Sequence, residues 1–152
     1  MPSRDDVLPA KKQMSDKFFL DTNILIYSLD KRVPAKQDVA LKLVKRAKAE
    51  GGCISMQVAQ ECISLLTTKF QYLMAIKDVR HYLEMVLAPI AEPLEMMPLY
   101  RNALSLQERW KFRFYDALIV AAALTLECSQ LYSEDFQHGQ RIEGLTVVNP
   151  FI

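Results

Sequence analysis

Four acidic side chains, far apart along the chain, stand where apolar segments meet polar ones. Asp21 directly follows a short apolar run, and Asp135 comes three residues after another. Asp116 begins a long apolar segment, whereas the spacing of its neighbours places Glu61 in the apolar stripe of a helix. Carboxylates that converge within about 6 Å repel one another, and their pKa values rise unless a cation is present. If the fold brings them together, these residues predict an all-oxygen site for Mg²⁺ or Mn²⁺.

Each carboxylate also has an ordinary structural explanation. Asp21 could be a helix N-cap, and Asp116 could be stabilised by the N-terminus of its own helix. Asp135 lies in a polar turn, where acidic side chains are usually solvated. Glu61 is the hardest to explain in this way, because acidic residues are rarely buried in an apolar stripe without a partner.

Cysteine and histidine chemistry is poorly supported. Cys53, Cys62 and Cys128 are widely spaced and include no C-x-x-C pair, so we expect reduced thiols in a cytoplasmic protein. The only histidines, His81 and His138, lie in separate segments, which argues against a histidine-rich metal site. No Cys/His or Ser/His arrangement for nucleophilic catalysis can be recognised.

The elements that must position these residues alternate between strands and helices. Five short strands are predicted, at residues 17–20, 53–55, 94–97, 130–132 and 146–148. Helical segments are predicted between them, at residues 35–50, 57–70, 72–87, 98–109 and 115–127. This alternation predicts a parallel sheet covered on both faces by helices. Ligands bind beyond the carboxyl ends of such strands, where the four acidic residues are expected.

Length and composition limit the class of protein. The chain has 152 residues, of which 51% are hydrophobic, and a formal net charge of +1. The length fits one domain, and the charge excludes a uniformly basic nucleic-acid coat protein while allowing a local basic patch. We expect residues 1–16 to be a flexible extension and residues 17–152 to form the single domain. The longest apolar stretch, residues 117–126, is about half the length needed to cross a membrane.

Four motifs in series resemble those of a known family. They are Asp21-Thr22-Asn23, the segment from Ser55 to Glu61, Tyr115-Asp116-Ala117 and Ser133-Glu134-Asp135-Phe136. In order and spacing, these motifs resemble those of the PIN domain, and the resemblance covers residues 17–152. The tail over residues 138–151 is similar to VapC-type toxins in particular.

The resemblance implies a three-layer α/β/α fold with a central, mostly parallel five-stranded sheet. It implies a Mg²⁺- or Mn²⁺-dependent endoribonuclease, usually the toxin of a toxin–antitoxin pair, whose cleavage leaves a 5′-phosphate and a 3′-hydroxyl. The family's acidic quartet, which binds the metal and carries catalysis, corresponds to Asp21, Glu61, Asp116 and Asp135. The polar positions that support the quartet correspond to Asn23, Ser55 and Ser133.

The resemblance also implies partners. These are an RNA substrate, a second copy of the chain in a homodimer, and an antitoxin that covers the active-site groove. The apolar segments at residues 70–87 and 94–100 could supply such protein surfaces, or they could belong to the core.

A basic and aromatic segment leads into Asp116. Arg109, Lys111 and Arg113 alternate with Trp110, Phe112 and Phe114. Cations of this kind contact RNA phosphates, and aromatic rings stack on unpaired bases. Arg109, Lys111 and Arg113 are therefore candidate RNA-binding residues, although the aromatic rings could equally be core residues.

The sequence is also compatible with two other functions. A Mg²⁺-dependent phosphohydrolase on another α/β fold also places an Asp after its first strand, but many such enzymes use a D-x-D pair where this chain has Asn23. A non-catalytic RNA-binding module would bind RNA without cleaving it and would survive chelation, but the complete acidic quartet argues against it.

Overall fold

A six-stranded sheet forms the centre of the computed structural model, which describes residues 17–152. The extension predicted at residues 1–16 lies outside the described residues. The strands are β1 (Phe18–Leu20), β2 (Gly52–Ser55), β3 (Ala91–Glu92), β4 (Gln130–Tyr132), β5 (Arg141–Ile142) and β6 (Leu145–Val148). Their spatial order is β3-β2-β1-β4-β6-β5, and only the β5–β6 pair is antiparallel. The predicted α/β class with a mostly parallel sheet is confirmed.

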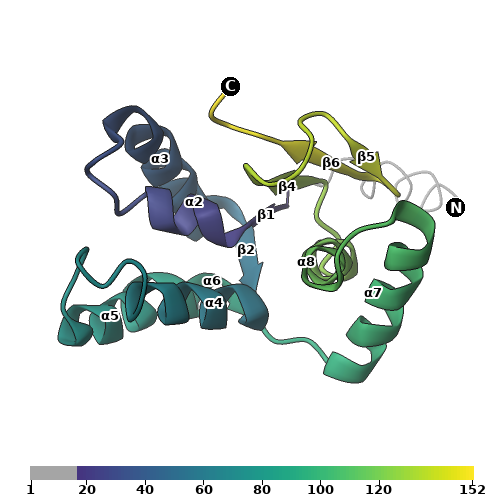
Figure 1. Ribbon diagram of the computed structural model, residues 1–152, viewed down its shortest axis with the longest axis horizontal. Coiled ribbons are helices and arrows are strands. Elements are labelled where there is room, and N and C mark those ends of the chain that lie inside the picture. The colour runs from purple at the N-terminus through teal and green to yellow at the C-terminus, as the bar shows by residue number, and fades with distance from the viewer. Residues whose placement is uncertain (1–16) are drawn as a thin grey trace, which may run out of the picture.

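Helices cover both faces of this sheet. They are α2 (Thr22–Tyr27), α3 (Pro34–Glu50), α4 (Met56–Leu66), α5 (Ile76–Tyr82), the π-helical turn η1 (Leu83–Leu87), α6 (Ala88–Ile90), α7 (Met96–Trp110) and α8 (Phe114–Thr125). In Figure 1, α7 and α8 lie on one side of the sheet and α2 and α3 on the other. Strand β1, at the centre of the sheet, is accordingly apolar and buried at every residue.

Local sequence signals explain where the main helices begin and end. Pro34 occupies the first turn of α3, where a missing N–H does no harm. Gly51 ends the helix in a left-handed conformation, with φ of 90°. The next glycine, Gly52, is required by packing, because a Cβ there would lie 2.4 Å from the Cβ of Ala47. Helix α8 is apolar nearly all round because it packs between the sheet and α7.

Two strands differ from the sequence prediction. The expected strand at residues 94–97 is wrong: β3 is at Ala91–Glu92, and α7 already begins at Met96. Pro93 has no N–H to continue the ladder, which is why β3 ends before it. The predicted count of five strands is also wrong, because β5 forms a hairpin with β6. Its two-residue turn, Glu143 and Gly144, has positive φ at both positions, as a type I′ turn requires.

The longest apolar stretch of the sequence was expected to be too short to cross a membrane. Among the helices of residues 17–152, none combines the length and the apolar character that a membrane span needs.

Candidate active site

Strand register brings Asp21 beside Ser133. Leu20 of β1 pairs with Tyr132 of β4, so the next residue of each strand emerges at the same edge of the sheet. The backbone N–H of Asp21 donates to the Tyr132 carbonyl at 3.0 Å. The buried Ser133 hydroxyl donates to Oδ2 of Asp21 at 2.7 Å. This edge is a switch point in strand order, because the chain continues from β1 to β2 on one side and reaches β4 on the other.

The Asp21 carboxylate is held in an unfavourable environment for a charge. It caps α2, accepting a hydrogen bond from the Thr22 N–H at 2.7 Å, and only 6% of the residue is exposed. The pKa of Asp21 is raised to about 6, mainly by burial and to a smaller extent by the charges of Asp135 and Glu61. The hydrogen bonds from Ser133 and Thr22 oppose this effect. Asp21 is therefore an N-cap and also a carboxylate whose charge is poorly compensated.

Asn23 fixes the loop that follows β4. Its Nδ2 donates to Oδ2 of Asp135 at 3.1 Å, and its Oδ1 accepts from the Glu134 N–H at 3.3 Å. The Asp135 N–H in turn donates to the Ser133 hydroxyl at 3.0 Å. Asp135 itself is exposed. Asn23 and Ser133 thus connect Asp135 to the end of β1.

Glu61 reaches the same region from α4. The Thr22 hydroxyl donates a hydrogen bond to its Oε1. Ser55 begins this helix as its N-cap, accepting from the Val58 N–H at 3.3 Å. The sequence-based placement of Glu61 in an apolar stripe is wrong: Glu61 is exposed, while its neighbour Cys62 is buried. A rotation of about 100° per residue separates the two side chains, and the carboxylate leaves the core toward Thr22.

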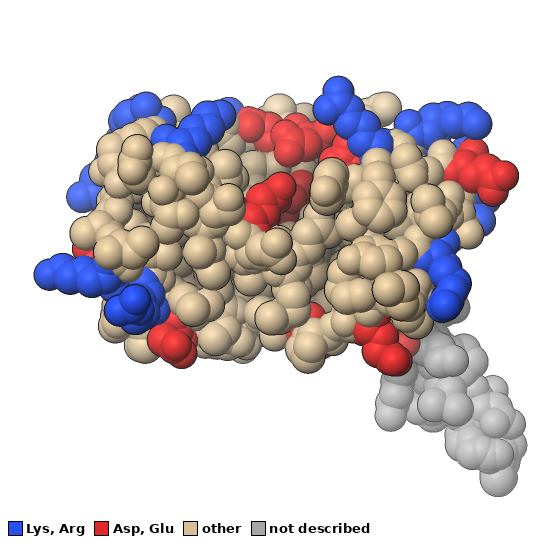
Figure 2. Space-filling model, turned by 60° about the horizontal axis from the view of Figure 1, so that its bottom comes forward, with Lys and Arg blue, Asp and Glu red and all other residues tan. Residues whose placement is uncertain are grey.

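Asp116 lies in the first turn of α8 and completes the group. Its pKa is raised, first by burial and then by the charge of Asp135, with a smaller contribution from Glu61. Arg113, the N-cap of α8, opposes this increase. Asp21 and Asp116 therefore both sense Asp135 and Glu61, so the four carboxylates form one electrostatic cluster. Figure 2 shows acidic side chains gathered in a hollow, with Lys and Arg side chains toward either side.

The donor set suits a hard divalent cation. None of the four carboxylates forms an ion pair with a Lys or Arg within the described part of the chain. Their mutual repulsion is the condition that a cation relieves, and their oxygens are the ligands that Mg²⁺ and Mn²⁺ prefer. As the side chains of residues 17–152 are arranged, no three acidic, histidine or cysteine side chains converge as a ready set of metal ligands.

A groove of about 490 Å³ runs beside these carboxylates, and we call it the Asp21 groove. It is lined by Asp21, Glu61 and Asp135, and also by two cations, Arg32 and Lys69. Arg32 makes two hydrogen bonds with buried Asp30, at 3.0 and 2.9 Å, which fixes its guanidinium. No local motif distinguishes these two cations from the other basic residues of the chain, because only the fold places them beside Asp21.

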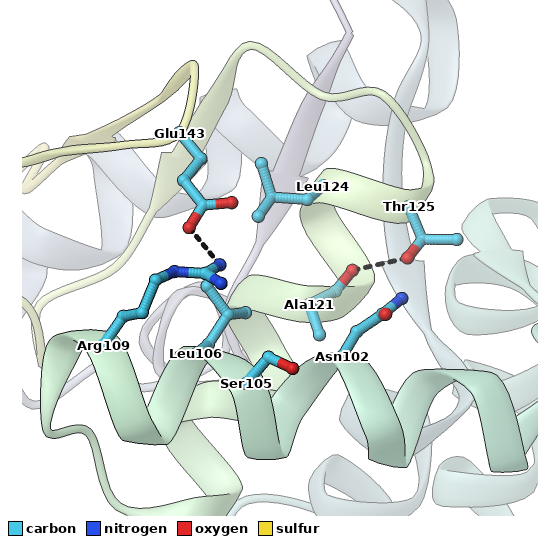
Figure 3. Close-up of a pocket in the computed structure, with 8 residues that line it drawn as sticks. All are labelled: Asn102, Ser105, Leu106, Arg109, Ala121, Leu124, Thr125 and Glu143. Carbon is cyan, nitrogen blue, oxygen red and sulfur yellow. Dashed lines mark hydrogen bonds and ion pairs between the residues drawn. The ribbon is translucent and has the colours of Figure 1, made fainter.

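The three predicted RNA-binding residues have different surroundings. Arg113 acts on Asp116, as described above. Arg109 forms an ion pair with Glu143 and lines a separate cavity of about 420 Å³ between α7 and α8 (Figure 3). Lys111 is exposed where α7 ends, with a left-handed φ of 64°.

The aromatic rings of this segment are partly packed against the core and partly exposed to solvent. Trp110 stacks on Phe112 with ring centroids 6.4 Å apart, and Phe112 meets Phe136 edge-on at 5.8 Å. Phe112 packs against the core, whereas Trp110 remains 37% exposed. These rings are therefore engaged with one another as well as with solvent.

A second contact that sequence reasoning missed supports the loop of Asp135. Glu134 accepts a hydrogen bond from the Tyr27 hydroxyl at 2.7 Å and forms an ion pair with Lys36. The Lys36 ammonium also lies over the rings of Tyr27 and Phe151, 4.7 and 5.4 Å from their centroids. The position of Glu134 beside Asp135 was the only signal available, because its partners lie 98 and 107 residues away.

Comparison with known proteins gives a consistent result. The family model of the PIN domain matches residues 18–141. A toxin–antitoxin complex from Klebsiella pneumoniae contains a similar structure, with a TM-score of 0.61 and 22% identity over 90% of this chain and 98% of that one. VapC20 of Mycobacterium tuberculosis, a toxin that cleaves the sarcin–ricin loop, gives a TM-score of 0.54 and 20% identity over 78% of this chain and 89% of that one. The search of curated proteins found no match.

Proposed function

We propose that this chain, which belongs to the PIN domain family, is a divalent-metal-dependent endoribonuclease and the toxin of a toxin–antitoxin pair that acts in the cytoplasm. The observation that carries the proposal is the electrostatic cluster at the end of β1 and β4. There, a buried aspartate with a raised pKa senses the charges of Asp135 and Glu61, and the same two charges act on Asp116. Such a cluster is unfavourable for stability, which is typical of a functional site.

The four carboxylates have distinct roles in this proposal. Asp21 and Asp116 would hold Mg²⁺ or Mn²⁺, and Asp135 and Glu61 would assist directly or through water. When bound there, the cation would supply the charge that lowers the pKa of a water molecule and offsets charge on the scissile phosphate. Ser133 and Asn23 donate hydrogen bonds to Asp21 and Asp135, and Thr22 donates one to Glu61. Ser55 acts indirectly, as the N-cap of the helix that carries Glu61.

RNA needs cations near this acidic cluster, because its phosphates are repelled by carboxylates. Arg32 and Lys69 share the Asp21 groove with three of the carboxylates, and Arg113 acts directly on Asp116. Arg109 and Lys111 extend the same basic segment away from the groove. We propose that Arg32, Lys69 and Arg113 contact the phosphates nearest the cut, with Arg109 and Lys111 in outer positions.

Protein partners follow from the structural neighbours and from exposed apolar side chains. One neighbour is a toxin–antitoxin complex, which supports an antitoxin partner for this chain. Ile76, Met85 and Met97 are 68, 51 and 63% exposed, although Tyr82 and Leu99 from the same segments are buried. We propose that the exposed residues contribute to a homodimer or to antitoxin binding, which light scattering of the purified chain and of its complex would test.

The central experiment is incubation of the purified protein with total cellular RNA in Mg²⁺, in Mn²⁺ or with a chelator, followed by mapping of the cut ends. We expect cleavage with either cation and none with the chelator, and new ends that carry a 5′-phosphate and a 3′-hydroxyl. Asp116→Asn should abolish cleavage, whereas Asp38→Asn, a change at an exposed carboxylate on α3, should not. RNA binding that survives chelation, without cleavage in either metal, would instead support a binding module.

A further inference from the structure

A second groove meets the acidic cluster at Glu61, and we call it the Tyr115 groove. It encloses about 650 Å³ between α4, the start of α7 and the start of α8. Glu61 lines both this groove and the Asp21 groove. We propose that the Tyr115 groove binds one unpaired nucleobase of the RNA strand, next to the phosphate that is cut. This inference rests on the proposed ribonuclease function and adds a subsite that recognises a base.

Aromatic side chains give the groove a surface on which a base can stack. Tyr115 immediately precedes Asp116 in the chain and is 71% exposed, so core packing does not explain this large ring. Phe114 supports it edge-on, with ring centroids 5.8 Å apart, and Tyr100 lies 6.1 Å from Phe114. Single-stranded RNA is commonly held by stacking of its bases on rings of this kind. The exposed ring beside a proposed metal ligand therefore indicates a base rather than a folding contact.

An unpaired amide adds a means of recognition. Gln57, on the first turn of α4, lines the Tyr115 groove, and its Oε1 is buried without a hydrogen-bond partner among the described residues. A buried acceptor without a partner is unfavourable, and a ligand that supplies a donor removes this penalty. Because Gln57 lines the groove, a ligand bound there lies beside its side chain. There it could accept from the N–H or exocyclic amino group of a base.

The two grooves divide the parts of a nucleotide between them. The Asp21 groove carries the cations Arg32 and Lys69, which suit phosphates, and the Tyr115 groove carries rings and the amides of Gln57 and Gln60, which suit a base. A strand that crosses Glu61 would place a phosphate over the carboxylates and the neighbouring base on Tyr115. A protein segment in the Tyr115 groove is the competing occupant, and the tests below separate the two.

The first test compares Tyr115→Ala with Tyr115→Phe on a short RNA that the wild-type protein cuts at one site. Base stacking on an aromatic ring predicts a loss of about 5- to 150-fold in kcat/KM for Tyr115→Ala. Tyr115→Phe keeps the ring and should stay near the wild-type value. On an RNA that lacks the base beside the cut, wild type and Tyr115→Ala should be equally slow. Leu104→Ala, a change at an exposed residue of α7 outside the groove, is the control.

The second test uses Gln57→Leu, which removes the unpaired amide with little change in size. We expect the preference among the four bases beside the cut to weaken, whereas the melting temperature should stay unchanged or rise because the unpaired acceptor is gone. Gln71→Leu, at an exposed glutamine, is the matched control and should change neither property. A lower melting temperature with an unchanged base preference would show that Gln57 is structural, which contradicts its role in the subsite.

The failure of this inference can be distinguished from the failure of the proposed function. If wild type cuts RNA and Tyr115→Ala cuts it equally well, the subsite is wrong and the ribonuclease proposal stands. If wild type does not cut RNA, binding of a short RNA that contains 2-aminopurine still decides the question. Fluorescence quenching by wild type and Tyr115→Phe, but not by Tyr115→Ala, would support the subsite. Equal quenching by all three proteins, or none by any of them, would overturn it, as would Tyr115→Ala weakening only antitoxin binding.

Discussion

Replacing Asp21 by Asn should make the metal-free protein more stable while it removes the activity. The pKa of Asp21 is raised by burial from 3.8 to about 6 in the folded protein. Each pKa unit corresponds to about 1.4 kcal/mol, so the ionised carboxylate lowers the free energy of unfolding by about 3 kcal/mol above pH 6. Below about pH 3 the carboxyl is protonated in the folded and unfolded chains alike, and this penalty is absent. Between these limits the penalty grows as the pH rises.

An asparagine at this position preserves most of the local structure. Its amide oxygen can accept from the Thr22 N–H, because Asn caps helices about as well as Asp. Its amide NH₂ can donate to the Ser133 hydroxyl, but there it competes with two donors already present, the Asp135 N–H and Asn23. We therefore expect a gain in the free energy of unfolding of about 1 to 3 kcal/mol at pH 8, smaller than or equal to the penalty removed.

Urea unfolding followed by circular dichroism, with a chelator present, measures this gain. The stabilisation of Asp21→Asn should be present in full at pH 8 and should fall below about 1 kcal/mol at pH 4. Added Mg²⁺ should stabilise the wild-type protein more than the variant, since a ligand stabilises the folded state according to its affinity. Asp38→Asn changes an exposed aspartate that pairs with Lys42 at 3.1 Å, and it should alter stability by less than about 0.5 kcal/mol.

Two results would refute the reasoning about Asp21. If the variant unfolds at a lower urea concentration than wild type at pH 8, the buried carboxylate contributes more through its hydrogen bonds than its charge costs. If the gain is equally large at pH 4, the pKa of Asp21 is not the cause. Metal-dependent RNA cleavage by pure Asp21→Asn protein would separately contradict its assignment as a metal ligand.

Three further changes test other parts of the structure. Ser133→Ala removes a hydrogen bond to the Asp21 carboxylate and should therefore raise the pKa of Asp21. In a pH profile of cleavage, the acidic limb should shift upward by about 1 to 2 pH units. Ser133→Thr keeps the hydroxyl and should leave the profile unchanged. Gly52→Ala would place a Cβ 2.6 Å from Cε2 of Phe18. It should reduce the free energy of unfolding, measured by urea titration, by about 1 to 3 kcal/mol. An unchanged midpoint of urea unfolding would contradict this packing. Arg113→Gln should weaken RNA binding more at low salt than at high salt in a fluorescence titration, and a loss independent of salt would argue against a phosphate contact.

Much of the fold follows from local patterns. The apolar run of β1 and the limits of α3 follow from residue type and from Pro34 and Gly51. Strand β5 was missed because it has only two residues, although Glu143-Gly144 supplied a turn signal. β3 was misplaced because two bridging residues have almost no pattern of their own, and their position depends on pairing with β2.

The sequence determined which carboxylates are candidates: Asp21 and Asp135 follow strands, and Asp116 lies near the start of a helix. Glu61 lies on the helix that follows β2. The sequence also indicated that parallel strands would bring these residues to one edge. Tertiary structure alone decided how they interact. The register that pairs Leu20 with Tyr132 sets the Ser133 hydroxyl against Asp21, 112 residues away. The same packing leaves Arg109 paired with Glu143 and brings Arg32 into the groove of Asp21. Contacts between residues this far apart depend on how whole elements pack against one another, which no local pattern of residues encodes.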